Sequence, residues 1–154
     1  MNNNPLRTPA SSEVNSLSHH IIACAMKVHS SLGPGLLEST YEVCLEHELR
    51  KTGIAVERQV ALPVRYDGVQ IDCGYRTDLL VERKIISELK AVDRLALIHE
   101  AQLLTYLKLA GLNLGLMINF NVLHLREGIK RIVNNLPEAI SSQSAQRNAT
   151  GKAK

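Results

Sequence analysis

The stretch YRTDLLVERKIISELK, residues 75–90, decides the architecture of this chain. It contains two apolar segments with β-type alternation around a short charged segment, and it therefore predicts two adjacent strands. Three charged side chains interrupt the apolar residues: Asp78, Glu88 and Lys90. Burying a carboxylate or an ammonium group is costly unless a partner compensates its charge. These three residues must therefore satisfy one another or surround something else.

Strand parity determines which of these side chains can meet. Glu88 and Lys90 are two residues apart, so their side chains point to the same face of their strand. In a hairpin, Asp78 shares that face only if the connection has an odd number of residues, such as residues 82–84, or contains a bulge. A two-residue loop would instead place Asp78 and Glu88 on opposite faces of the sheet.

The charged cluster has two interpretations at this point. In the first, Lys90 neutralises Asp78 or Glu88 in a structural ion pair, which leaves one carboxylate uncompensated. Two carboxylates within about 4–6 Å repel each other unless one is protonated or a cation lies between them. In the second interpretation the cation is Mg²⁺, which takes one or two carboxylates, several waters and phosphate oxygens of a substrate. Lys90 would then hold a phosphate and orient or deprotonate an attacking water.

Composition limits the class of protein. The chain has 154 residues, of which 45% are apolar and 21% charged, with a formal net charge of +3. These values predict one soluble domain, and the charge is too small for a dedicated electrostatic binder of nucleic acid. No apolar run approaches the roughly 18–20 residues that span a bilayer, and the N-terminus lacks a secretory signal, so we expect a cytoplasmic protein without a membrane segment. The scattered cysteines are expected to be reduced core residues: Cys24, Cys44 and Cys73.

The apolar periodicity predicts helices and strands in a mixed order. Helices are expected over 16–32 and 36–51, separated by Gly-Pro-Gly at 33–35, and over 97–111. The inner side of the second helix is expected to carry Leu37, Tyr41, Cys44, Leu45 and Leu49. Strands are expected over 56–66, 69–82, 84–92 and 112–122, with a hairpin turn at Asp67-Gly68, and residues 124–136 read as a short strand or helical turn.

This order predicts an α/β fold with a mixed central sheet flanked by helices. The element order is α-α-β-β-β-α-β followed by a strand or helical turn. The polar, aperiodic segments 1–15 and 138–154 are expected to be disordered tails, which leaves one domain over residues 16–137.

Two further motifs add polar residues to predicted helices. GLLESTY, residues 35–41, places Glu38 in a first helical turn and Tyr41 one turn later. HEAQLLTY, residues 99–106, places Gln102 and Tyr106 four residues apart on one helix face. Each motif also has an ordinary structural interpretation: Glu38 as an acid that complements the helix dipole, Tyr106 as a half-buried aromatic residue and Gln102 as a solvated one.

Together these motifs resemble a known pattern. Asp78, then Glu88-Leu89-Lys90, then Gln102-x-x-x-Tyr106 resembles the PD-(D/E)XK nuclease superfamily, in particular its RecB-type branch with a Q-x-x-x-Y helix. The preceding Gly35-x-x-Glu38-x-x-Tyr41 is similar to the GxxExxY family within that superfamily. The resemblance covers residues 16–133 and implies a restriction-endonuclease-like fold. Thr77 stands where the superfamily name has proline.

The resemblance implies a metal-dependent hydrolysis of phosphodiester bonds. Asp78, Glu88 and the backbone carbonyl of Leu89 would bind Mg²⁺ or Mn²⁺, and Glu38 would complete the acidic cluster. Lys90 would position the attacking water and stabilise developing charge. The other implied residues would hold the site or the substrate backbone: Tyr41, Arg76, Gln102 and Tyr106.

The resemblance also implies a nucleic-acid partner, with DNA favoured over RNA. Because no sequence-reading motif accompanies the core, we expect recognition of the phosphate backbone with little sequence preference. A homo-oligomer or a partner subunit could supply additional binding surface. The main alternative is a non-catalytic module with a nuclease fold that serves binding or assembly. A third, less favoured hypothesis is an enzyme that acts on a small phosphorylated molecule.

Overall fold

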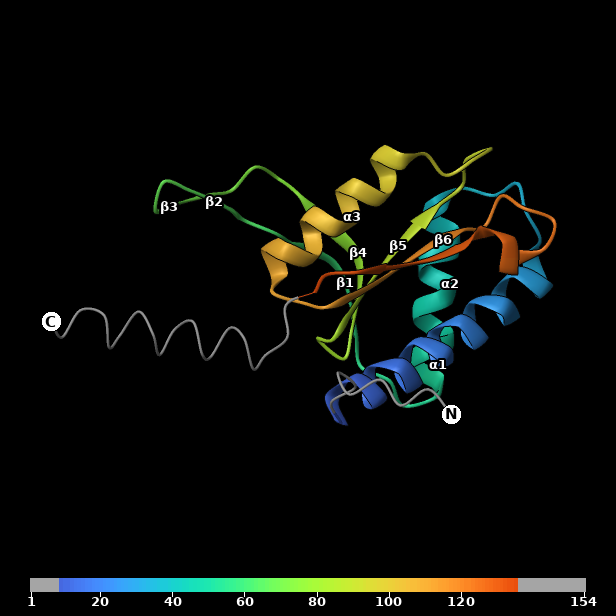
Figure 1. Cartoon of the computed structure of the whole chain (residues 1–154). Helices are drawn as coiled ribbons and strands as arrows, with labels where there is room; N and C mark the ends of the chain where they lie inside the picture. The colour runs from blue at the N-terminus through green and yellow to red at the C-terminus, as the bar shows by residue number, and fades with distance from the viewer. Residues whose placement is uncertain (1–8, 136–154) are drawn as a thin grey trace, which may run out of the picture.

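The central sheet has the strand order β1-β4-β5-β6-β7 (Figure 1). The structure, a computed structural model, describes residues 9–135. β5 and β6 are parallel, and the other neighbouring pairs are antiparallel. This mixed sheet confirms the predicted fold class. The elements in chain order are α1 (Pro9–Leu32), α2 (Glu38–Lys51), β1 (Val56–Ala61), β2 (Val64–Tyr66), β3 (Val69–Ile71), β4 (Arg76–Val81), β5 (Ile85–Lys90), α3 (Leu97–Ala110), β6 (Leu114–Asn119), the 3₁₀ turn η1 (Leu125–Gly128) and β7 (Ile129–Val133).

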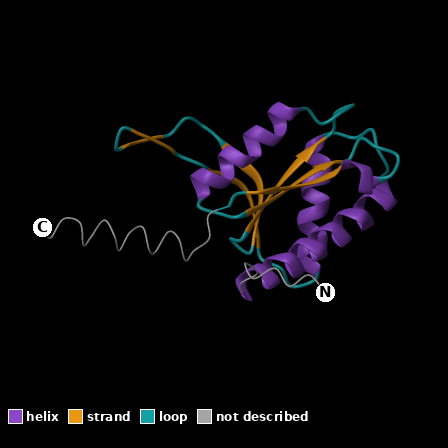
Figure 2. Ribbon diagram, viewed as in Figure 1, coloured by secondary structure: helices purple, strands orange, loops and turns teal. Residues whose placement is uncertain are grey.

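Helices cover both faces of the sheet (Figure 2). α1 and α2 pack on one face, where their apolar side chains meet alternate residues of β4, β5 and β6. α3 packs on the other face against the intervening residues of the same strands, including Leu80, Ile86 and Met117. β6 is buried along its whole length, as expected for its continuous apolar sequence. No helix among residues 9–135 is long and apolar enough to cross a membrane.

The connection between β4 and β5 has the odd length that the site requires. Val81 pairs with Ile85, and Leu79 pairs with Ser87, so three residues, 82–84, form the loop. Glu82 and Arg83 both have positive φ angles, of 52° and 53°, which close this short turn. The same register places Asp78 and Glu88 on one face of the sheet, the face that α3 covers.

A short hairpin projects from the sheet (Figure 1). The sequence predicted two long strands around Asp67-Gly68, and the turn is confirmed, with β2 and β3 paired on either side of it. The long strands are nevertheless interrupted, so that β2 and β3 form a separate two-stranded sheet. Pro63 has no N–H to donate to a ladder, and Gly74 has a φ of +75°, which redirects the chain before β4. We call residues 62–75 the arm.

Three smaller expectations are wrong: the start of α1, the burial of Leu37 and the burial of Cys73. α1 begins at Pro9 and not near Ser16, because proline is accepted in a first helical turn and Arg131 binds Asn15 and Ser18 from β7. Leu37 is 74% exposed, because α2 begins only at Glu38 and Leu37 precedes its first turn.

Cys73 is exposed on the arm, whereas Cys24 is buried and Cys44 is partly buried. The expected tail over 138–154 and the first eight residues lie outside the described residues.

Tyr41 holds the loop that leads into α2. Its hydroxyl donates a hydrogen bond to the Gly33 carbonyl oxygen at 2.6 Å and accepts one from the Leu36 N–H at 3.1 Å. The ring is fully buried and stacks on Phe120, with centroids 4.4 Å apart and planes at 11°. This one side chain therefore connects the Gly-Pro-Gly loop to the end of β6 and positions the residue that follows it, Glu38.

Replacing Tyr41 with phenylalanine should destabilise the protein. The variant keeps the ring but leaves two backbone groups without their partner, which costs about 1–3 kcal/mol of unfolding free energy. Urea unfolding measures this loss. Tyr66→Phe is the matched control, because Tyr66 is 73% exposed at the tip of the arm. Equal stabilities of the two variants would contradict the assigned role of the Tyr41 hydroxyl.

Candidate active site

Asp78 and Glu88 are joined across β4 and β5 by two hydrogen bonds. The Asp78 N–H donates to Glu88 Oε1 at 3.0 Å, and the Leu89 N–H donates to Asp78 Oδ2 at 2.9 Å. Each carboxylate therefore accepts a backbone hydrogen bond from the opposite strand. The regular backbone ladder between these strands ends at Leu79 and Ser87, and the side chains continue the connection beyond that point. The two carboxylates are thus held close together by the backbone.

The Glu88 carboxyl carries a strongly perturbed pKa. Its residue is only 6% exposed. Burial is the largest cause and the Asp78 carboxylate the second, and together they raise the pKa of Glu88 from 4.5 to about 8. The Asp78 backbone N–H and the Lys90 ammonium act in the opposite direction but do not cancel these effects. At neutral pH the site therefore favours either a proton or a cation between the carboxylates.

Lys90 lies next to the pair without neutralising it. The structural ion-pair interpretation requires its ammonium within about 4 Å of Asp78 or Glu88. Among the ion pairs of the described residues, Lys90 is paired with neither carboxylate. Its side chain is half-buried on the same strand face as Glu88, and its carbonyl oxygen accepts a hydrogen bond from the Phe120 N–H at 2.9 Å. The ammonium group is therefore available for another anion.

Two residues that sequence reasoning missed connect this site to α2. The Gln59 side-chain amide donates to Glu42 Oε1 at 3.0 Å and to Asp78 Oδ1 at 3.3 Å. Glu42 is 5% exposed and also accepts a hydrogen bond from Arg58 Nε at 3.1 Å. Gln59 reaches both acids because its φ of 53° turns β1 out of its regular line.

The position of Glu42 four residues after Glu38 was a usable signal, because it puts both acids on one helix face. The backbone turn at Gln59 has no recognisable signal in the sequence.

Glu38 lies on the other side of an open cleft. The cleft has a volume of about 520 Å³, and both Glu38 and Asp78 line it together with Leu36, Leu37, Ser39, Glu42, Gln59 and Ala91. Glu38 Oε1 accepts a hydrogen bond of 3.3 Å from the Ala91 N–H, immediately after β5. The structure thus brings Glu38 to the same cleft as Asp78, but neither Glu88 nor Lys90 lines that cleft. Among the described residues, Glu38, Asp78 and Glu88 do not form one metal-sized group.

The α3 residues form a second border of the site. Gln102 Nε2 donates a hydrogen bond to the Tyr106 hydroxyl at 3.0 Å, so the two predicted residues contact each other directly. Tyr106 is 7% exposed and packs against Leu80 and Ile86. Burial, and then the nearby Glu88 carboxylate, raise the pKa of the Tyr106 phenol, so the phenol stays protonated.

The predicted site residue Arg76, at the start of β4, is exposed. Its guanidinium donates a hydrogen bond to the Gln59 carbonyl oxygen at 3.4 Å.

The donor set of the pair fits a hard divalent cation. Asp78 and Glu88 each use one oxygen for a backbone N–H, which leaves Glu88 Oε2 and, apart from the 3.3 Å bond from Gln59, Asp78 Oδ1. Two carboxylates with open coordination positions are typical of Mg²⁺ sites that also take water and phosphate oxygens. Within residues 9–135, no three His, Cys, Asp or Glu side chains are grouped closely enough to enclose a metal. Any cation here would therefore keep positions open for water and substrate.

The comparison with known protein families gives one match. Residues 15–132 match the family described as the PD-(D/E)XK nuclease superfamily. The chain belongs to the PD-(D/E)XK nuclease superfamily. The match covers all the described strands except the last residue of β7. No curated protein matches the chain, and neither does any solved structure.

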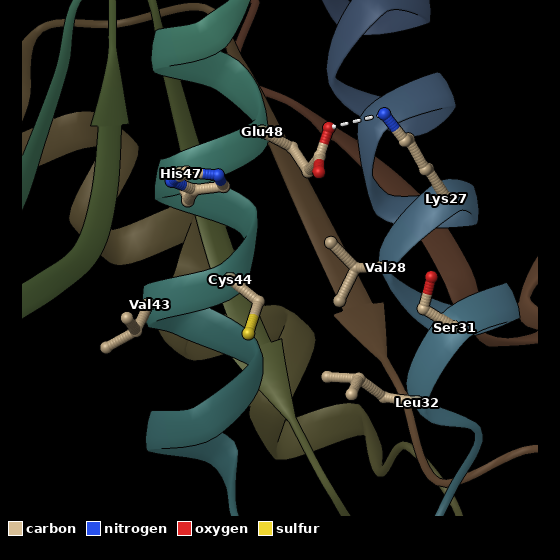
Figure 3. Close-up of a pocket in the computed structure, with 8 residues that line it drawn as sticks. All are labelled: Lys27, Val28, Ser31, Leu32, Val43, Cys44, His47 and Glu48. Atoms are coloured by element: carbon tan, nitrogen blue, oxygen red, sulfur yellow. Dashed lines mark ion pairs between the residues drawn. The ribbon is translucent and has the colours of Figure 1, made fainter.

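This PD-(D/E)XK protein has a second cavity, whose lining residues Figure 3 shows. It is a groove of about 310 Å³ between α1 and α2, bordered by the ion pair of Lys27 Nζ and Glu48 Oε2 at 3.1 Å. Its lining is largely apolar and includes Val28, Leu32 and Val43. The groove shares no lining residue with the cleft at Asp78 and is not part of the site.

The raised pKa of Glu88 predicts a stability that falls as pH rises. Below pH 4.5 the Glu88 carboxyl is protonated in both the folded and the unfolded protein, so it does not reduce the unfolding free energy. Between 4.5 and about 8 only the unfolded protein releases the proton, and stability is lost. In the presence of EDTA, the unfolding free energy of wild type should fall by roughly 3 kcal/mol relative to Glu88→Gln between pH 5.5 and 8.5.

Chemical denaturation of both proteins at the two pH values measures this difference. The neutral amide of the variant matches the shape of the carboxyl group, so the comparison isolates its charge. Parallel pH profiles of the two proteins would show that the carboxyl has no raised pKa.

Proposed function

We propose that this chain is a Mg²⁺- or Mn²⁺-dependent nuclease that cleaves phosphodiester bonds of DNA with little sequence preference. Within its superfamily we assign it to the GxxExxY family, and to the RecB-type branch on the basis of Gln102 and Tyr106. The observation that carries the proposal is the uncompensated pair of Asp78 and Glu88. Asp78 of this pair lines an open cleft, and the unpaired Lys90 lies two residues after Glu88 on β5.

Each residue of the site has a proposed role in hydrolysis. Asp78 and Glu88, with the Leu89 carbonyl oxygen, would hold the cation, which when bound supplies Lewis-acid stabilisation and water activation. Lys90 would orient the attacking water and stabilise charge on the phosphate, because its ammonium is not consumed by an internal ion pair. The Glu42–Gln59 connection would hold Asp78 in place. Glu38, across the cleft, would contact the site through water.

The alternative function is a non-catalytic binding or assembly module. The absence of a third acidic side chain within a metal-sized group of the described residues favours it. Against it, the chain retains both carboxylates and the lysine, whereas a binding module has no use for a buried carboxyl that destabilises the fold. We therefore favour the enzyme. We also propose that the protein is cytoplasmic, where DNA is accessible and cysteines stay reduced. We further propose that it recognises the phosphate backbone of its substrate.

Metal binding should stabilise the protein through Glu88. At a Mn²⁺ concentration 100-fold above the dissociation constant, the unfolding free energy should rise by about 2.7 kcal/mol, because the cation binds only the folded state. Differential scanning calorimetry at pH 7.5 should show this as a higher melting temperature, and Glu88→Gln should abolish the rise. A wild-type melting temperature unchanged in millimolar Mn²⁺ would contradict an intact metal site.

Lys90→Ala should separate catalysis from folding. Because Lys90 forms no ion pair with the carboxylates, its removal should leave the melting temperature and the Mn²⁺ affinity nearly unchanged. The rate of DNA cleavage should fall about 100-fold or more. Lys108→Ala, at the exposed end of α3, is the matched control and should cleave at the wild-type rate.

A Lys90→Ala protein that loses stability would mean that the lysine is a structural counter-ion. Wild-type protein that has bound Mn²⁺ but cleaves no nucleic acid would support the binding module.

A further inference from the structure

The few aromatic side chains of this chain fall into two groups. The sequence contains four tyrosines, one phenylalanine and no tryptophan. Tyr41 and Phe120 stack on each other in the core between the sheet and α2. The other three lie on the opposite side: Tyr106 on α3, Tyr75 at the base of the arm and Tyr66 near its tip. Tyr66 and Tyr75 are exposed, although aromatic surface is scarce in this protein.

Tyr75 is held in place while much of its surface stays open. Its carbonyl oxygen accepts a hydrogen bond of 2.7 Å from the Leu62 N–H, which ties the two sides of the arm together at its base. Its ring lies against Tyr106, with centroids 6.2 Å apart and planes at 54°. Tyr75 is nevertheless 45% exposed. The contact with Tyr106 therefore covers only part of the ring and leaves the rest facing solvent.

The Tyr75 ring is connected to the carboxylate pair by the packing of Tyr106. Tyr106 packs with Leu80 and Ile86, which stand two residues from Asp78 and Glu88 on the same face of β4 and β5. The arm ends directly before β4, so Tyr75 is only three residues from Asp78 in the chain. Three residues span at most about 10 Å between Cα atoms, so we place the Tyr75 ring within reach of the nucleotide next to a phosphate bound at the pair.

The charges of the arm indicate which part of a polymer this ring would contact. Over the arm, residues 62–75, the single arginine Arg65 stands against two aspartates, Asp67 and Asp72, which gives a net charge of −1 (1 − 2). A segment without excess positive charge gains little from phosphate contacts. An exposed tyrosine ring instead offers a surface on which a nucleobase can stack. In a duplex both faces of a base are already stacked on neighbours, whereas a single strand leaves them free.

We propose that Tyr75 stacks on an unpaired base beside the scissile phosphodiester, so that the substrate is DNA with a single-stranded segment at the cleavage point. This inference rests on the nuclease function proposed above. Tyr106 positions the Tyr75 ring from behind and does not itself touch the base. The arm beyond Tyr75, including Tyr66, extends past the contact and is not needed for it.

The test compares single-stranded and duplex oligonucleotides. Fluorescein-labelled 20-mers, one single-stranded and one fully paired, are titrated with the protein in Ca²⁺ for anisotropy and incubated with it in Mn²⁺ for cleavage. Tyr75→Ala should weaken binding of the single strand by about 5- to 100-fold and leave the weaker duplex binding unchanged. Tyr75→Phe should bind like wild type, because it keeps the ring. Tyr66→Ala is the matched control on the arm and should also bind like wild type.

A second variant guards against a folding defect. Tyr75→Leu keeps an apolar side chain against Tyr106 but offers no ring, so it should be as stable as wild type and lose the same single-strand affinity. If wild type cleaves both oligonucleotides equally and the Tyr75 variants lose nothing, the inference is overturned while the nuclease function stands. If wild type binds the single strand through Tyr75 but cleaves neither oligonucleotide, the nuclease function fails and the base-stacking site remains. Binding of neither oligonucleotide overturns both.

Discussion

The crossed hydrogen bonds between Asp78 and Glu88 and the opposite backbone are the constraint on which the site depends. Each carboxylate is attached to the neighbouring strand, so neither can rotate away to reduce its burial or the repulsion between the two charges. The fold is stable enough to hold them because Leu80 and Ile86, next along the same strands, are packed under α3. The favourable packing of one end of the hairpin thus maintains an unfavourable charge arrangement at its other end, where a cation or a proton relieves it.

Much of this arrangement could be predicted because it depends on local patterns. The period-two alternation identified β4 and β5 but left the length of the turn between them open. The three-residue turn 82–84 of the structure sets their register and puts Asp78 and Glu88 on one face. Gly111, in the left-handed conformation, ends α3 at the boundary predicted from the sequence. The continuous apolar run identified β6 as a buried central strand. Each of these features is encoded within about ten residues.

The features that could not be predicted depend on contacts between distant parts of the chain. Gln59 joins Glu42 to Asp78 only because the backbone of β1 turns at that residue, and glutamine carries no preference for such a turn. Arg131 extends the ordered part of α1 through bonds to residues 113 and 116 positions earlier. Leu37 resembled a core residue because its apolar character fitted the helical period, but the helix begins one residue later. A single sequence does not reveal which element covers a residue, and for this reason these three features were not predicted.

The turn in β1 at Gln59 has a consequence for the behaviour of the protein in solution. β1 is an outer strand of the sheet, and the open side of such a strand can accept a strand from another molecule. The backbone departs from a straight line at Gln59, and Pro63 two residues beyond the strand offers no N–H, so the run available for intermolecular pairing is short. The opposite outer strand, β7, carries Lys130 and Arg131, whose charges oppose close approach of a second copy. The residue that steadies Asp78 therefore also helps to keep the sheet from growing by addition of further molecules.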